Sequence, residues 1–191
     1  MKTKNNVMVL LVVLILGSCA PVAKLAPTET GFPISTLTYD NWNEFSSKFT
    51  SDVGTIQYSL HYPQDWYVYP GSTKSEPGLE GQTYFQNFER IGKVGGDTSD
   101  YQVAGTARLE IYALPCAKTE EGCDVAGLST LASNLQGVKK IENRSGWTVW
   151  TVFLYTKIYR LSLIGYMIGT PEQNDALIKI LDKILSTVVI K

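Results

Sequence analysis

Residues 147–168 read WTVWTVFLYTKIYRLSLIGYMI, and this stretch decides the fold. Apolar side chains occupy both alternating faces of its two halves, 147–155 and 159–168, so neither half can turn a face to water. We therefore predict two central strands of one sheet. The breaks at Ser145-Gly146 and at Thr156-Lys157 are short enough only for hairpins, which predicts antiparallel neighbours.

Shorter segments with strand character precede this pair. Residues 56–62 alternate apolar and polar side chains, as a half-buried strand does. The other predicted strands are residues 66–69, 83–88, 103–114 and 138–143.

The final helix is the best-specified element of the sequence. Thr170 and Gln173 form a capping-box pattern around Pro171, which takes the first helical position. The apolar residues that follow fall on one stripe, which needs a sheet face to cover. These residues are Leu177, Ile180, Leu181, Ile184, Leu185 and Val188.

A second helix is predicted at residues 124–136, with Asp124 as its N-cap and Gly137 placed to end it. Residues 40–49 carry aromatic side chains three to four positions apart, which predicts a short third helix. With a helix available for each face, we expect an α+β fold, in which an antiparallel β-sheet is flanked by helices on both faces. This is a layered α/β/α sandwich.

The N-terminus has the parts of an export signal. Lys2 and Lys4 make it positive, and residues 7–16 form an unbroken apolar run. Such a run is too short to cross about 30 Å of hydrocarbon, which takes roughly 20 helical residues. Residues 1–18 are therefore predicted to be a removable signal peptide.

The segment Leu16-Gly17-Ser18-Cys19 resembles the lipobox of bacterial lipoproteins, in which the Cys takes a diacylglycerol before cleavage. The resemblance implies that Cys19 is lipidated and anchors the protein in the cell membrane, on the extracytoplasmic side. The alternative is a buried Cys in an ordinary signal peptide. Residues 19–37 contain three prolines and no regular period, which predicts a flexible tether. Residues 38–191 are expected to form one globular domain.

Charge and histidine content exclude several functions. The chain has 17 basic and 18 acidic residues, and removal of residues 1–18 leaves a formal charge of about −3. No basic stripe is present, so no nucleic-acid partner is expected. His61 is the only histidine, and Asp97 and Asp100 lack the spacing of a calcium loop, so we expect no catalytic triad, metal site or cofactor.

Cys116 and Cys123 are the two cysteines left after Cys19 is acylated. An exported protein permits a disulfide between them, and the polar segment that they enclose contains a Gly that lets it fold back. A zinc site is the alternative, but it lacks further Cys or His ligands. We therefore predict a disulfide.

Three further segments form a recognisable series: Tyr62-Pro63-Gln64-Asp65-Trp66, the strand at residues 159–163 and the helix end at residues 184–187. In these segments the sequence resembles the PsbP-like family, whose fold is shared with small Ran-binding proteins of eukaryotes and with bacterial lipoproteins. The resemblance spans roughly residues 54–190. It implies an antiparallel sheet flanked by helices and a non-catalytic role such as scaffolding, photosystem assembly or ion retention. The lipobox departs from the thylakoid members.

A group of aromatic residues is the candidate ligand-binding site: Trp66, Tyr67, Tyr69 and Tyr84. Aromatic side chains near a surface often mark recognition sites. They are equally suited to packing within strands, which is the alternative.

Two functions remain open. The first is a membrane-anchored, non-enzymatic binding or accessory module of the cell envelope, for which an envelope protein complex is the candidate partner. The second is an envelope hydrolase that uses paired carboxylates, such as Glu110 with Asp65 or Glu89. The lack of a nucleophile–base pair, metal cluster or phosphate loop favours the first.

Overall fold

The computed structural model describes residues 42–70, 82–89, 104–119, 122–132 and 135–191. The predicted signal peptide, Cys19 and the tether at residues 19–37 lie outside this part, as do Asp97 and Asp100.

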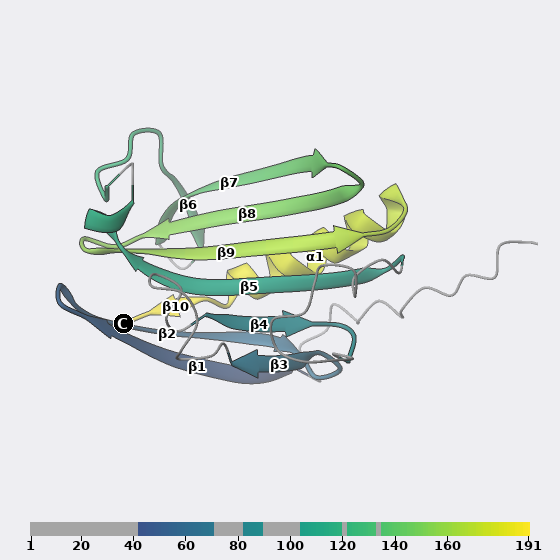
Figure 1. The fold of residues 1–191 in the computed structure, drawn as a ribbon, viewed down its shortest axis with the longest axis horizontal. Coiled ribbons are helices and arrows are strands. Elements are labelled where there is room, and N and C mark those ends of the chain that lie inside the picture. Colours follow the sequence, from purple (N-terminus) through teal and green to yellow (C-terminus); the bar gives the residue numbers. More distant parts are fainter. Residues whose placement is uncertain (1–41, 71–81, 90–103, 120–121, 133–134) are drawn as a thin grey trace, which may run out of the picture.

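Ten strands and one α-helix make up most of the described chain (Figure 1). The helix α1 spans Pro171–Ser186. The strands are β1 Trp42–Ser51, β2 Gly54–Pro63, β3 Tyr67–Pro70, β4 Thr83–Gln86, β5 Thr106–Pro115, β6 Ser129–Ala132, β7 Leu135–Arg144, β8 Trp147–Tyr155, β9 Tyr159–Ile168 and β10 Val189–Ile190.

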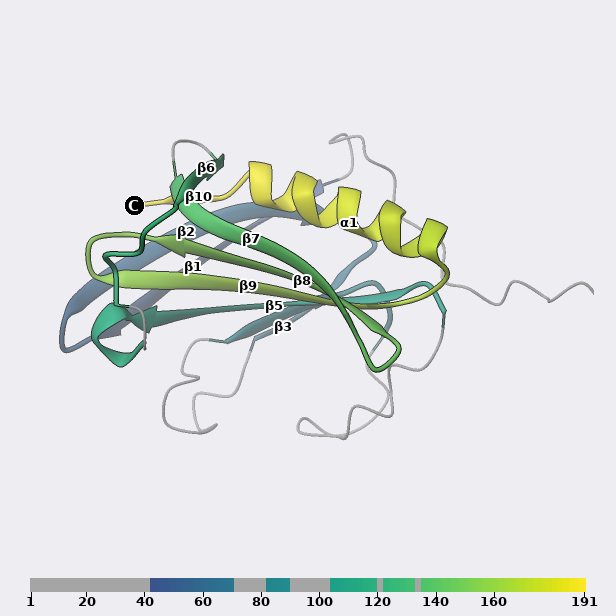
Figure 2. The same cartoon turned by 90° about the horizontal axis from the view of Figure 1, so that it is seen from above.

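The strands form two antiparallel sheets. The larger sheet has the order β3-β4-β5-β9-β8-β7-β6, and the smaller has the order β1-β2-β10. Helix α1 and the smaller sheet both cover one face of the larger sheet, which we call the inner face (Figure 2). One continuous core lies between these layers, and its largest fully buried side chains include Trp150, Tyr58 and Phe85.

The two central strands are confirmed. β8 and β9 have the bounds predicted from the sequence, and each is antiparallel to its neighbours. The β7–β8 hairpin turns at Ser145 and Gly146, which have φ values of 47° and 87°. Positive φ at both positions matches the right-handed twist of the flanking strands.

Helix α1 also begins as predicted. The Thr170 hydroxyl accepts a hydrogen bond from the Gln173 amide, and the Gln173 side chain accepts one from the Thr170 amide. The helix approaches β9 closely at Gly165, where a Cβ atom would lie 2.4 Å from Cδ1 of Leu181. The glycine therefore lets the helix and the sheet touch.

The predicted α/β/α sandwich is wrong. Among the described residues α1 is the only α-helix, and it lies on one face of a fold that is mostly β. The second helix predicted at residues 124–136 does not form. Gly127 there has a φ of 76°, which a right-handed helix excludes, and the chain continues into β6 and β7.

Gly137 has a different role from the predicted helix end. It lies inside β7, where a Cβ atom would come within 2.4 Å of the Phe153 carbonyl oxygen. The side chains of Leu131 and Leu135, which suggested a helical stripe, pack against the core from β6 and β7. The apolar spacing in this region therefore reflects the short strand β6 paired with the start of β7.

The short helix predicted at residues 40–49 is also wrong, because residues 42–51 form β1. Phe45 and Phe49 are half-buried and pair with Leu60 and Ile56 of β2. Ser47 shares their face of the strand, so one position of the alternating pattern is polar. The aromatic residues that remain have a spacing that resembles a helix.

Candidate ligand-binding trough

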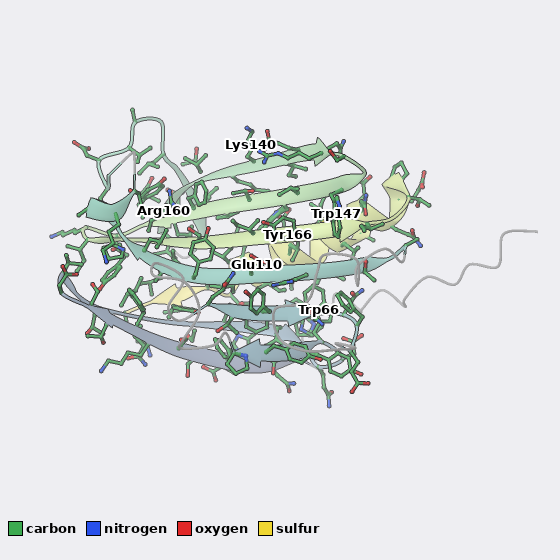
Figure 3. All side chains as sticks on the ribbon, in the orientation of Figure 1. Trp66, Glu110, Lys140, Trp147, Arg160 and Tyr166 are labelled. Carbon is green, nitrogen blue, oxygen red and sulfur yellow. A yellow bond between two sulfur atoms is a disulfide. The ribbon has the colours of Figure 1, made fainter. Side chains whose placement is uncertain are left out.

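The outer face of the larger sheet, opposite α1, is hollowed into a trough of about 700 Å³. Its lining comes from β8 and β9, which we call its floor, and from β5 and β7 on either side, which we call its walls. Figure 3 labels one lining residue on each of these strands: Trp147, Tyr166, Glu110 and Lys140. The lining combines aromatic, aliphatic and charged side chains: Arg108, Glu110, Val138, Lys140, Glu142, Arg144, Ser145, Trp147, Val149, Thr151, Phe153, Ile164 and Tyr166.

Strand register explains why these residues meet. Alternate residues of a strand point to the same face, so those that do not enter the core gather on the outer face. The register aligns them in rungs that cross the sheet from β5 to β7. One rung is Arg108, Tyr166, Val149 and Glu142, and the next is Glu110, Ile164, Thr151 and Lys140.

The β5 wall carries a partly buried ion pair. Arg108 Nη2 lies 2.9 Å from Glu110 Oε1, and the Gln82 side-chain amide donates a hydrogen bond of 3.1 Å to Glu110 Oε2. The Arg108 guanidinium also lies over the Tyr84 ring, 3.8 Å from its centroid. Burial raises the pKa of the Glu110 carboxyl, although Arg108 and Gln82 act in the opposite direction.

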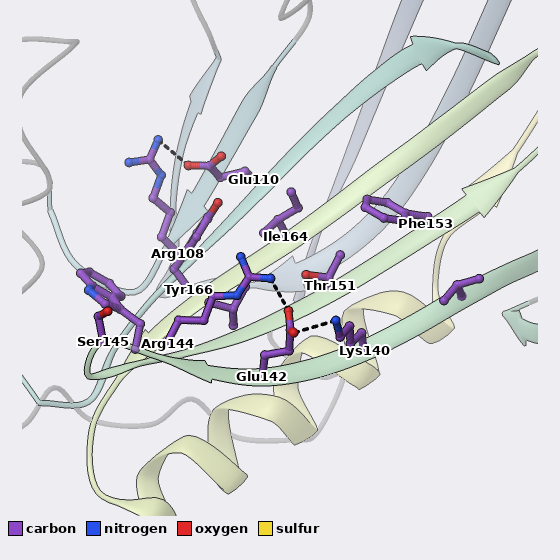
Figure 4. Close-up of a pocket in the computed structure, with 13 residues that line it drawn as sticks. Arg108, Glu110, Lys140, Glu142, Arg144, Ser145, Thr151, Phe153, Ile164 and Tyr166 are labelled. Atoms are coloured by element: carbon purple, nitrogen blue, oxygen red, sulfur yellow. Dashed lines mark hydrogen bonds and ion pairs between the residues drawn. The ribbon is translucent and has the colours of Figure 1, made fainter. Parts of the chain in front are cut away.

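The β7 wall carries two basic residues that share one carboxylate. Glu142 forms ion pairs with Lys140 and Arg144 (Figure 4). These hydrogen bonds lower the pKa of Glu142. The side chains of Lys140 and Arg144 remain 63% and 66% exposed, so solvent screens both pairs.

Tyr166 lies on the floor between the two walls (Figure 4). Burial raises the pKa of its hydroxyl most, and Glu110 raises it further, whereas Arg108 and Arg144 both lower it. Charged groups of both walls therefore act on this hydroxyl. Its ring forms an edge contact with Trp147, with 6.4 Å between centroids.

The aromatic residues singled out in the sequence separate into two groups. Trp66 is 4% exposed and belongs to the core. Tyr67, Tyr69 and Tyr84 lie on the outer face beyond the β5 wall, where Tyr67 and Tyr69 stack with centroids 6.5 Å apart. These three tyrosines extend the aromatic surface beside the trough, and ligand binding by them stays a prediction.

Glu110, which both predicted carboxylate pairs contain, contacts Arg108 and Gln82. The other acid of the trough is Glu142, on the opposite wall, where it contacts Lys140 and Arg144. The pairing of Glu110 with Asp65 or Glu89 stays a prediction.

The predicted disulfide is confirmed. Cys116 and Cys123 are joined, with their Cα atoms 5.2 Å apart. Cys116 opens a 3-10 helix, Cys116–Lys118, directly after β5. The bond therefore pins the end of a central strand to the segment that leads into β6.

The trough itself was not predicted from the sequence. Its charged residues come from strands far apart in the chain, so no local motif contains them. One signal was available: Arg108 and Glu110, like Lys140 and Glu142, are spaced two apart in strand segments and so share a face.

No family model, curated protein or solved structure matches the chain. Within the described residues, no helix is both long and apolar enough to cross a membrane. These residues also contain no group of three or more His, Cys, Asp or Glu side chains that could hold a metal ion.

Proposed function

We propose that this protein is a non-catalytic binding module of the cell envelope. Acylated Cys19 tethers it to the extracytoplasmic side of a membrane, and the trough binds its ligand. The observation that carries the proposal is the lining of the trough, where Trp147, Phe153 and Tyr166 face outward from a sheet whose core lies on the other side.

The chemistry of the trough supports binding rather than bond breaking. Glu110 is held by Arg108 and Gln82, and Glu142 is held by Lys140 and Arg144. A general acid or base must exchange its proton with substrate, whereas these carboxylates are engaged with basic or amide partners. Apolar pockets with a few placed polar groups are typical of ligand sites, and 700 Å³ lies within their usual size.

A matched pair of photo-crosslinking positions tests the proposal. Val138 lines the trough and is 37% exposed, whereas Val53 is 39% exposed in the β1–β2 turn. We expect p-benzoylphenylalanine at Val138, but not at Val53, to give a defined adduct after irradiation of intact cells. Mass spectrometry of the purified protein identifies the adduct as a small molecule or a protein of an envelope complex.

Equal labelling at both positions, or none at Val138, would contradict a ligand site in the trough. The near-equal exposure of the two valines removes solvent accessibility as an explanation for a difference.

A further inference from the structure

The charges of the trough differ in sign from those of the whole chain. The lining has three basic and two acidic residues, a formal charge of +1, whereas the chain has a net charge of −1. On the β7 wall, Lys140 and Arg144 share the single carboxylate of Glu142. A ligand group that balances this excess is anionic.

Two of the three basic residues of the lining, Arg108 and Arg144, lie toward one end of the trough, on either side of Tyr166 (Figure 4). The Arg108 guanidinium is directed toward Tyr84 of β4, whereas Arg144 is paired with Glu142 inside the lining. A guanidinium has five N–H donors, so Arg144 can bind Glu142 and a second oxygen acceptor together. The phenol hydroxyl of Tyr166 adds a further donor.

The residues that line the opposite end are apolar, and the cation Arg160 borders them. Beyond the rung of Glu110 and Lys140, register brings Phe153 of β8 beside Val138 of β7. Arg160 lies over the Phe153 ring at 4.4 Å, which covers one side of it. Ile164 connects this apolar end to Tyr166 along β9.

We propose that the trough binds an anionic amphiphile, with a carboxylate or phosphate group beside Arg144 and Tyr166 and an apolar body extending toward Phe153. This inference rests on the proposed function and assigns the chemical class of its ligand. A free amphiphile and a membrane lipid both present these oxygen acceptors to the arginine, and the experiment below distinguishes them.

Four probes with one chain length separate charge from apolar contact: dodecanoate, dodecyl phosphate, dodecanol and dodecyltrimethylammonium, each below its micelle concentration. Calorimetric titration uses the full chain with Cys19→Ala, which keeps acyl groups off the protein. We expect the two anionic probes to bind at least about tenfold more tightly than dodecanol, because each gains charge-assisted hydrogen bonds. The cationic probe should bind most weakly.

Matched variants locate the binding. Arg144→Gln should reduce the preference for dodecanoate over dodecanol about tenfold. Lys48→Gln makes the same charge change on the exposed surface of β1 and should leave the preference unchanged. Tyr166→Phe, which keeps the ring, should weaken the anionic probes only, and Phe153→Ala should weaken all probes that bind.

Equal affinities for the charged and neutral probes, or stronger binding of the cation, would overturn the ligand class. The proposed function would still stand in that case if the crosslinking experiment gave an adduct at Val138. Equal losses in the Arg144 and Lys48 variants would also overturn it. Phosphatidylglycerol vesicles that displace dodecanoate would assign the acid group to a membrane lipid. Vesicles without effect would assign it to a free amphiphile.

Discussion

Asp182 on α1 connects the helix to two strands of the larger sheet. Its Oδ1 accepts a hydrogen bond of 2.9 Å from the indole N–H of Trp150, and the Lys139 ammonium lies 2.5 Å from the same oxygen. Trp150 is fully buried on β8, whereas Lys139 and Asp182 are partly exposed. The carboxylate therefore satisfies a donor that water cannot reach.

This arrangement predicts unequal effects for the two partners of Asp182. Asp182→Ala should lower the free energy of unfolding by about 1–3 kcal/mol, because the buried indole N–H loses its acceptor. Lys139→Ala should cost no more than about 1 kcal/mol, since the pair is screened by solvent. Urea unfolding measures both, with Asp175→Ala on the exposed side of α1 as the control. Equal losses at Lys139 and Asp182 would show that the ion pair, not the indole, is what matters.

The two acids of the trough predict opposite dependences of stability on pH. The raised pKa of Glu110 means that the native chain holds this proton to higher pH than the unfolded chain does. Its contribution to stability is therefore full below about pH 4.5 and falls as the pH rises through the raised pKa. Glu110→Gln should remove this fall, which urea unfolding between about pH 4 and pH 7 measures.

Glu142 provides the comparison. Its lowered pKa makes its contribution present above the unfolded-state pKa and lost as the pH falls through the native value. In wild type, the free energy of unfolding should therefore decrease as the pH falls through the native pKa of Glu142, and Glu142→Gln should remove this decrease. Changes of the same sign in the two variants would contradict the opposite environments of these carboxylates.

At the scale of the elements, Gly165 controls the contact between β9 and α1. Leu181 is fully buried, so its methyl group cannot move away from a new Cβ atom at 2.4 Å. Gly165→Ala should lower the free energy of unfolding by about 1–3 kcal/mol through overpacking. Circular dichroism during thermal unfolding measures the loss.

A double-mutant cycle tests the cause. Leu181→Ala alone should cost about 2–5 kcal/mol, because it leaves a cavity. In the Gly165→Ala background it should cost less, since the added methyl group fills part of that cavity. Strictly additive losses would mean that the helix and the strand do not meet at Gly165.

The disulfide predicts a second effect at this scale. Replacement of Cys116 and Cys123 together by Ser should lower the free energy of unfolding by about 2 kcal/mol, because the bond closes a short loop in the unfolded chain. A reducing agent should destabilise the wild type similarly and leave the double variant unchanged. Two titratable thiols in the oxidised protein would contradict the pairing.

An element was predicted correctly from the sequence where apolar residues occupy most positions of its buried face. β8, β9 and α1 each carry an unbroken pattern, and the bounds of both strands and the N-terminal cap of the helix were predicted, whereas Val188, assigned to the helix, lies beyond its end at Ser186. In β1 a serine takes a place on the buried side of the strand, so the period of two was hidden. At residues 124–136, the short strand β6 and the start of β7 together imitated the spacing of one helix. The trough depends on pairing between distant strands, which no local pattern records.

At the scale of the whole molecule, the proposed acyl anchor at Cys19 predicts where the protein is found in the cell. Cys19→Ala should move the protein from the membrane fraction to the soluble fraction, because the acyl chains would be the main source of its membrane affinity. Immunoblotting of fractionated cells measures the distribution, with Cys116 and Cys123 left intact as the other cysteines. Unchanged fractionation would refute lipid anchoring at this residue.

Helix α1, which shares the covering of the inner face with the smaller sheet, follows every strand of the larger sheet in the sequence. As the chain leaves the ribosome, the part of the inner face that α1 covers, such as β9 at Gly165, therefore stays exposed until the helix has also been made. β2 likewise waits for β10, whose pairing joins segments more than a hundred residues apart. Completion of the native state is thus postponed until α1 and β10 have been made, which is compatible with the proposed export of the chain before it folds.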